Sequence, residues 1–250
     1  MPLTFAHPAA VLPFSRKSRY IHFFAMILGS MSPDFEYFLR GQPIGEIGHT
    51  FKGFLIFNLP LVVVVYLIYH IFIHQTLTNH LPLFLQDSYP KKIDFSSNTL
   101  KVTVFCYSAL LGMLTHVIWD SFTHRNGYTV MRFPALNHSF NLYGFDIPLY
   151  KFLQHGSTLF GISAIMVYIY CRALSQKNQN KVKVSAKQKF IFWSSLFLLA
   201  TLILVLWYLI DYVSIMSYGK VVVRIIDSTL LSLLILSLLF KYTGLFRKDD

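Results

Sequence analysis

The chain has 250 residues, of which 54 % are hydrophobic and only 13 % are charged. Because soluble domains carry about 25 % charged residues, this composition excludes an ordinary soluble protein and predicts one that lies largely in lipid. The formal net charge is +11, but the basic residues are scattered between apolar runs, so we expect no nucleic-acid partner.

The first fifty residues contain no segment long enough to span a membrane. The apolar stretch 20–31 has about a dozen residues, whereas a hydrocarbon core about 30 Å thick requires roughly 20, so an interfacial or re-entrant helix is expected there. This stretch ends in Gly-Ser-Met-Ser-Pro-Asp, a turn-rich sequence that places Asp34 next to the membrane.

Five longer apolar segments follow, and each is long enough to cross the membrane as a helix. They lie near residues 54–74, 101–119, 152–171, 190–212 and 221–240. The sequence therefore predicts an all-α, polytopic integral membrane protein with about five transmembrane helices and a short N-terminal interfacial part.

The distribution of basic residues predicts the orientation. Six Lys and Arg residues lie in the short loop 172–189, and the positive-inside rule places such a loop in the cytoplasm. Counting segments outward from it places residues 1–53 and the loop 121–151 together on the outer face. Basic residues between Arg16 and Lys52 oppose that orientation, so the shared face is better supported than the side it occupies.

The clearest site signal lies at the polar end of the second apolar segment, in His-Val-Ile-Trp-Asp-Ser-Phe-Thr-His. Here His116, Asp120 and His124 are spaced by four residues and therefore share one face of a helix. Nitrogen and carboxylate oxygen donors on a rigid helix favour a zinc site. The alternative is a helix end whose polar residues face lipid headgroups.

Further candidate residues emerge on the same expected face. They include the potential ligands His7, Asp34, His49 and His155. Together with the three residues of the helical column they make seven donors, enough for two or three zinc ions. Asp120, in the middle of the column, suits a carboxylate that bridges two of them. Candidate substrate-binding residues are Arg224, Lys52, Arg125 and Ser157.

Two of these substrate-binding candidates have structural alternatives. Ser157 follows Gly156 near a helix start, where free N–H groups suit a phosphate, but ordinary helix-start chemistry explains the motif equally well. Arg224 could bind a substrate phosphate or form an ion pair with Asp227, three residues further along the same segment.

The motifs resemble those of an uncharacterised bacterial membrane-protein family, of the domain of unknown function 4184 type. The resemblance rests on Met-Pro-Leu-Thr-Phe-Ala-His-Pro, Gly-Ser-Met-Ser-Pro-Asp, the His-x3-Asp-x3-His column and Gln-His-Gly-Ser. The order of these residues also resembles membrane-bound metal-dependent hydrolases and the zinc-dependent phospholipase C and single-strand nuclease superfamily. That resemblance implies catalytic roles for Asp120 and Asp34 and metal ligation by His7, Asp34, His49, His116, Asp120, His124 and His155.

The resemblance does not extend to every position of those zinc enzymes. This chain has Leu159 where they carry an acidic residue one helical turn after the final histidine. Two zinc ions are therefore expected rather than three. The predicted organisation is a site-bearing membrane domain over residues 1–173, a basic cytoplasmic loop over 174–189 and a C-terminal transmembrane hairpin over 190–250.

The leading functional hypothesis is a zinc-dependent hydrolase in the bacterial plasma membrane, similar to a phospholipase C or a lipid phosphatase. Its substrate would be a phospholipid or a lipid-linked phosphate at the outer face. The alternative is a non-catalytic membrane protein with a structural metal site, or an ion or lipid transporter, which charged residues within the last segments favour. A third possibility is an amidase or ester hydrolase, because metal-activated water does not by itself select phosphorus over carbon.

Overall fold

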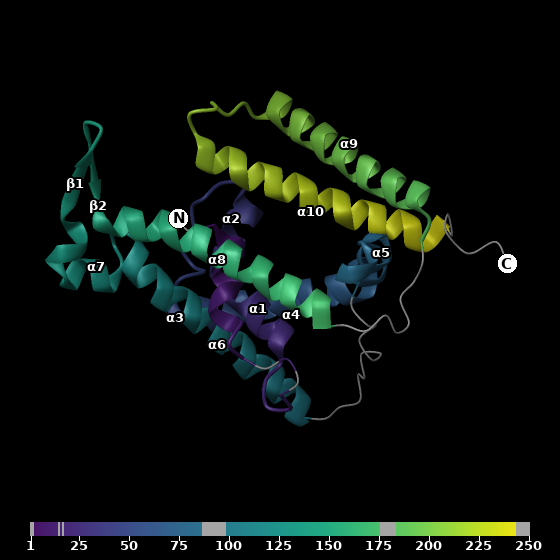
Figure 1. Cartoon of the computed structure of the whole chain (residues 1–250), viewed down its shortest axis with the longest axis horizontal. Helices are drawn as coiled ribbons and strands as arrows, with labels where there is room; N and C mark the ends of the chain where they lie inside the picture. Colours follow the sequence, from purple (N-terminus) through teal and green to yellow (C-terminus); the bar gives the residue numbers. More distant parts are fainter. Residues whose placement is uncertain (1–2, 15, 17, 87–98, 176–183, 244–250) are drawn as a thin grey trace. The chain divides into compact units, whose positions relative to one another are not determined.

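The computed structural model describes residues 3–14, 16, 18–86, 99–175 and 184–243. Within these residues, five helical stretches are long and apolar enough to cross a membrane (Figure 1). They are Phe51–His80, Thr99–Arg132, Leu149–Ser175, Ala186–Ile210 and Tyr218–Tyr242. The prediction of an all-α integral membrane protein with five spanning segments is confirmed.

The first two spanning stretches are composite. Phe51–His80 is built from α3 (Phe51–Gly53), η3 (Phe54–Asn58), α4 (Leu59–Ile68), η4 (Tyr69–Ile73) and α5 (His74–His80), of which η3 and η4 are π-helical. Thr99–Arg132 consists of α6 (Thr99–Thr123) and the short α7 (Tyr128–Arg132). Single turns of π-helix occur frequently at functional sites, which draws attention to η3.

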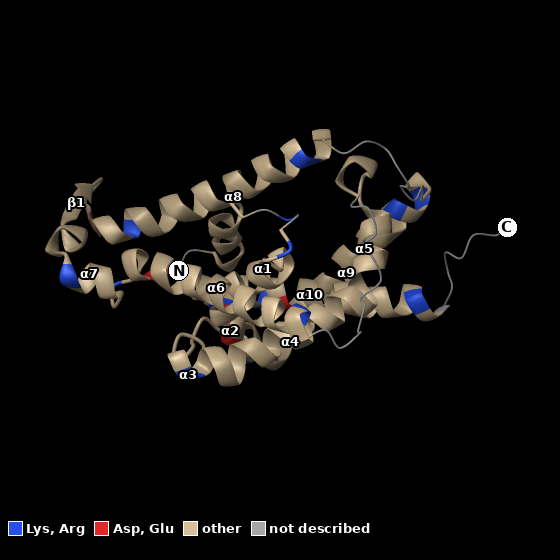
Figure 2. Cartoon of the chain, turned by 90° about the horizontal axis from the view of Figure 1, so that it is seen from below, with Lys and Arg blue, Asp and Glu red and all other residues tan. Residues whose placement is uncertain are grey.

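The remaining spanning helices are uninterrupted. They are α8 (Leu149–Ser175), α9 (Ala186–Ile210) and α10 (Tyr218–Thr243). Figure 2 shows that Lys and Arg lie mainly toward the ends of these helices, as expected for elements whose middle faces hydrocarbon.

The N-terminal part is short, as predicted. It contains the 3-10 helix η1 (Thr4–Val11), α1 (Phe23–Met31), a further 3-10 turn η2 (Ser32–Asp34) and α2 (Phe35–Arg40). Nδ1 of His22 caps α1 by accepting the Ala25 N–H at 3.1 Å. With 9 residues, α1 is about 14 Å long and cannot cross the bilayer alone.

Two glycines allow α1 to pack directly on α6. A Cβ atom at Gly29 would lie 2.1 Å from the Ala109 carbonyl oxygen, and one at Gly112 would lie 2.2 Å from the Met26 carbonyl oxygen. Backbone therefore rests on backbone at this contact, and larger side chains are excluded. The close approach fixes the end of α1, and with it Ser30 and Asp34, against the middle of α6.

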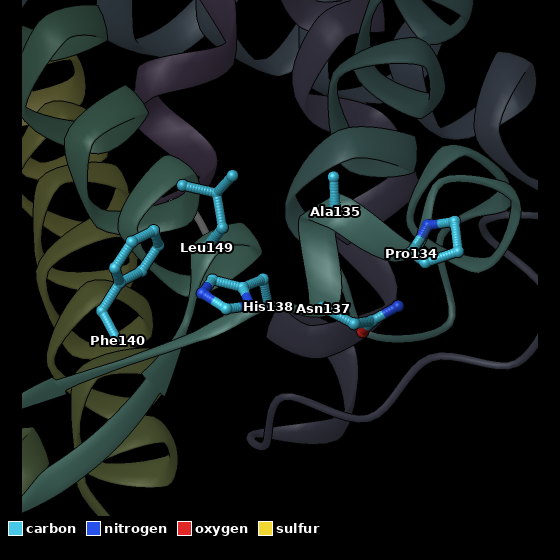
Figure 3. Close-up of a pocket in the computed structure, with 6 residues that line it drawn as sticks. All are labelled: Pro134, Ala135, Asn137, His138, Phe140 and Leu149. Carbon is cyan, nitrogen blue, oxygen red and sulfur yellow. The ribbon is translucent and has the colours of Figure 1, made fainter.

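A β-hairpin between α7 and α8 departs from the predicted all-helical pattern. After η6 (Pro134–Asn137), strands β1 (Ser139–Leu142) and β2 (Phe145–Pro148) pair antiparallel across Tyr143 and Gly144, both with positive φ. A pocket of about 650 Å³ lies beside this hairpin. In Figure 3, Phe140 and Leu149 lie on one side of it, and Pro134 and Ala135 lie on the other. Its lining residues include none of the candidate metal ligands.

Contacts divide the chain into two compact units. The first contains residues 1–35, 46–63 and 97–172, and the second contains residues 36–45, 64–96 and 173–250. In the second unit, α9 packs along α10 (Figure 1). The predicted site-bearing domain and the first unit both contain all the candidate ligands. Half of the predicted basic loop 174–189, namely residues 176–183, lies outside the described residues.

Candidate metal centre

Six of the seven predicted ligands meet inside the first unit, although they are far apart in the sequence. One side chain comes from η1, one from η2, one from the loop before α3, and three come from α6 and the residue that follows it. In that order they are His7, Asp34, His49, His116, Asp120 and His124.

One carboxylate oxygen of Asp120 faces a compact group of donors. Asp120 Oδ2 lies 3.2 Å from His116 Nε2 and 3.7 Å from His49 Nε2. Asp34 Oδ1 lies 3.6 Å and 3.5 Å from the same two nitrogens. A tetrahedral zinc ion with bonds of about 2.0–2.2 Å separates neighbouring ligands by about 3.3–3.6 Å. His49, His116 and Asp120 each offer one ligand atom within 4.8 Å of the others, so they are close enough to hold one cation. Asp34 belongs to a second group of this kind, with His7 and His116.

The other carboxylate oxygen of Asp120 faces a second group of histidines. Asp120 Oδ1 lies 3.6 Å from His7 Nε2 and 3.4 Å from His124 Nδ1. The His7 ring also stacks on the His116 ring, with centroids 3.7 Å apart, which brings the two groups together. This arrangement suits a carboxylate that bridges two cations.

Several of these ligand atoms are buried without a hydrogen bond among the described residues. They are His7 Nε2, Asp34 Oδ1, His116 Nε2, Asp120 Oδ1 and His124 Nε2. A buried polar atom left unsatisfied costs about 1–3 kcal/mol, so five in one place require an explanation. Bound cations would satisfy all five atoms.

Neighbouring groups hold the ligands in orientations that suit metal binding. The backbone carbonyl of Ser30 lies 2.7 Å from His116 Nδ1 and can only accept, so Nδ1 carries the proton and Nε2 presents its lone pair to the cluster. Nδ1 of His124 lies 3.2 Å from the Asp120 carbonyl oxygen as well as 3.4 Å from Asp120 Oδ1, so Nε2 is the nitrogen of this ring that is left for a ligand. The hydroxyl of Thr4 donates to Asp34 Oδ2 at 2.7 Å, which leaves Asp34 Oδ1 to face the histidines.

The loop that carries His49 is held on both sides of the preceding glycine. A Cβ atom at Gly48 would lie 2.2 Å from the Pro33 carbonyl oxygen. The fully buried Asn58, on η3, donates from Nδ2 to the Gly48 carbonyl oxygen at 2.6 Å. Sequence analysis missed Asn58 as a positioning residue, although a buried amide within an apolar run was an available signal.

Burial also shifts the ionisation of two of the clustered residues outside the spanning helices. Burial, with the nearby His116 ring, lowers the pKa of His7 to about 3, so His7 is neutral at physiological pH and able to bind a metal. Burial raises the pKa of the Asp34 carboxyl, although His116 and the Thr4 hydroxyl act in the opposite direction. A buried carboxylate of this kind is stabilised by a nearby cation.

A family model described as "Domain of unknown function (DUF4184)" matches residues 1–238. The chain belongs to this family. No curated protein and no solved structure matches it. The predicted resemblance to the DUF4184 type is confirmed, and all six clustered residues lie within the matched region. The resemblance to the zinc hydrolase superfamilies stays a hypothesis.

In this DUF4184 protein, the structure does not bring His155 to the cluster. Helix α8 begins at Leu149, and the exposed His155 has no described contact with the six ligands. The buried residue is its neighbour Gln154, whose Oε1 makes no hydrogen bond among the described residues. The same face of α8 contacts the N-terminal segment, because Thr158 Oγ1 accepts the Leu3 N–H at 3.2 Å.

The candidate substrate residues of the DUF4184 protein have different environments. Lys52 and Arg125 are exposed, each close in sequence to a clustered histidine. Helix α8 begins at Leu149, so Ser157 lies beyond its first turn, where the N–H groups already bond within the helix. The prediction that free N–H groups bind a phosphate at Ser157 is therefore wrong. Arg224, in the second unit, pairs with Asp211 and lies over the Trp207 ring, rather than pairing with Asp227.

The different positions of His155, outside the cluster, and His49, within it, give the first prediction for the DUF4184 protein. We expect His155→Ala to leave the bound zinc unchanged, because His155 is exposed outside the cluster. His49→Ala should lower it from about two ions per chain to about one, because His49 contributes to only one ligand group. Elemental analysis of the detergent-purified variants measures both outcomes, and zinc loss in His155→Ala would contradict the six-ligand centre.

Proposed function

We propose that the protein is a membrane-embedded, zinc-dependent hydrolase that cleaves a phosphoester of a phospholipid or a lipid-linked phosphate. The observation that carries this proposal is the position of Asp120, whose two carboxylate oxygens face two separate groups of donors. A pair of cations about 3.5–4 Å apart is the usual arrangement for phosphoester hydrolysis.

The two groups differ in a way that assigns them different roles. A cation held by His49, His116 and Asp120 would have up to four protein ligands with Asp34, whose Oδ1 lies 3.5 Å from His49 Nε2, and it would stay in place. A cation held by His7, Asp120 and His124 would have three protein ligands and would leave a coordination position for water and substrate. When bound there, zinc supplies a nucleophilic water at neutral pH and polarises a phosphoryl oxygen.

The chain itself orients the reacting groups and balances their charge. Asp34 and Asp120 provide two negative charges, so two divalent cations leave a net charge of about +2 that attracts a phosphate. The exposed Lys52 and Arg125 are placed to assist, because they follow His49 and His124 closely in the sequence. We further propose that the site lies on the outer face of the bacterial plasma membrane, as the count of segments predicts.

The alternatives each have less support. A purely structural metal site does not require an open position. Of the three charged residues that favoured transport, Arg224 and Asp211 balance each other, which leaves Asp227. An amidase or carboxylic ester hydrolase shares the metal chemistry, but the charge of two cations favours an anionic phosphoester.

Metal analysis combined with a substrate screen tests the proposal. Protein purified in detergent without chelator should contain about two zinc ions per chain and should release phosphate or a phosphorylated headgroup from phospholipids or polyprenyl phosphates. Removing zinc should abolish the release, and adding zinc should restore it. Zinc-loaded protein that hydrolyses none of these lipids would contradict the enzymatic role, and protein without stoichiometric metal would contradict the site itself.

A further inference from the structure

An apolar groove lies beside the metal cluster in the first unit. It has a volume of about 490 Å³ and lies between η1, α6 and α8. Its apolar walls are formed by Ala10, Ile118, Trp119, Phe122 and Leu153. With a rotation of about 100° per residue, the α6 residues of the groove fall on the helix face beside the one that carries His116, Asp120 and His124.

The hydroxyl groups in the groove wall are directed to their own helices. Thr115 Oγ1 donates to the Gly112 carbonyl oxygen at 2.7 Å, and Thr123 Oγ1 donates to that of Trp119 at 3.3 Å. Ser157 Oγ donates to the Gln154 carbonyl oxygen at 3.1 Å. The hydroxyl protons are therefore already used, and the groove offers a hydrocarbon chain an almost wholly apolar surface.

One end of the groove reaches the open ligand group. The Trp119 ring lies 6.5 Å from the His7 ring, centroid to centroid. Thr123 Oγ1 lies 3.3 Å from His124 Nδ1. A molecule lying in the groove would therefore place its adjoining group beside His7, Asp120 and His124.

The rim of the groove belongs to the surface that faces lipid. Ile118, Phe122 and Leu153 lie in spanning helices and are 52 %, 46 % and 38 % exposed. A hydrocarbon chain can pass from the bilayer into the groove without crossing water. Because lipid is as apolar as the groove, the transfer gains little hydrophobic free energy, and the main effect of the groove is to position the chain.

We propose that this groove binds the hydrocarbon chain of an anionic lipid whose phosphate lies at the open ligand group. This inference rests on the proposed function and deepens it, because it restricts the substrates to phosphates attached to a long apolar chain. Charge and apolarity support the same occupant, since the cation pair attracts the phosphate and the groove accommodates the chain.

The test uses zinc-loaded, full-length protein and a phosphatidic acid that carries a diazirine at the end of one acyl chain. Upon illumination, wild type should be labelled mainly within 115–123 and 153–157, and excess long-chain phosphatidic acid should prevent this labelling. Ile118→Trp, which fills the groove, should reduce the labelling at least about fivefold. Leu111→Trp is the matched control, because Leu111 is 40 % exposed on the same helix and does not line the groove.

Two further measurements separate the groove from the enzymatic function. Zinc content should be equal in wild type and both tryptophan variants, so that any loss of labelling is not a loss of metal. Hydrolysis of long-chain phosphatidic acid should fall in Ile118→Trp and should be unchanged in Leu111→Trp. Specific labelling without any hydrolysis would support the groove and contradict only the proposed function. Uniform labelling along all spanning helices, together with normal hydrolysis, would contradict lipid binding in the groove and leave the proposed function intact.

Discussion

Asp120→Asn is expected to remove both zinc ions and to lower phosphoester hydrolysis at least about a thousandfold, which corresponds to about 4 kcal/mol of lost transition-state stabilisation. The asparagine has the same shape but only one oxygen, and its amide hydrogens would point toward one of the two histidine groups. Since Asp120 Oδ1 and Oδ2 each face a different group, no single-oxygen side chain can serve both.

The matched control for this substitution is Asp146→Asn. Asp146 lies on β2, where its Oδ1 accepts a hydrogen bond from Asn141 Nδ2 at 3.0 Å, away from the six ligands. The control should retain about two zinc ions and full activity. Elemental analysis and phosphate release measure both variants. If Asp120→Asn kept two ions and normal hydrolysis, the bridging role of Asp120 would be wrong.

Gly29→Ala is expected to have the largest effect on stability. The added methyl group would lie 2.1 Å from the Ala109 carbonyl oxygen, so α1 and α6 must separate. Overpacking of this kind costs about 3 kcal/mol, and we expect the melting temperature in detergent to fall by about 6–12 °C. Because the same shift would draw the Ser30 carbonyl away from His116 Nδ1, zinc affinity should fall as well.

Gly156→Ala provides the control for this prediction. A Cβ atom at Gly156 meets nothing within 4 Å, and the residue lies inside α8. Replacing a helical glycine by alanine stabilises a helix by about 0.5–1 kcal/mol, so the melting temperature should rise slightly. Thermal unfolding followed by circular dichroism compares the two variants. Equal melting temperatures would show that the contact between α1 and α6 is looser than the structure indicates.

The spanning helices and the His116 column could be predicted because their signals are local. Runs of apolar residues predict spanning helices, and a spacing of four residues predicts a shared helix face. His7, Asp34 and His49 could be assigned only to the same membrane face. Their meeting point depends on the packing of α1 on α6, which the two glycines permit but which no periodicity encodes.

The features that sequence analysis missed depend on fine geometry. Whether His155 or Gln154 faces inward is decided by a rotation of about 100° per residue, and the predicted helix start at residue 152 did not fix that rotation. Asn58 is marked as a polar residue within an apolar run, but it acts through the backbone carbonyl of Gly48, so the sequence does not reveal its partner. The hairpin 139–148 has few β-branched residues, and its turn depends on positive φ at Tyr143 and Gly144.

The contact between α1 and α6 also determines when the metal centre can form during synthesis. Ser30 and His116 are 86 residues apart, so a ribosome that adds about 5–20 residues per second needs roughly 4–17 seconds to make the second after the first. During that interval α1 is too short to remain across the bilayer, and Asp34 has none of its α6 partners. The N-terminal segment must therefore wait at the membrane surface and dock only after the second spanning helix is in place. If the cluster binds metal as proposed, its loading is a late step of biogenesis, separated in time from insertion of the first spanning helix.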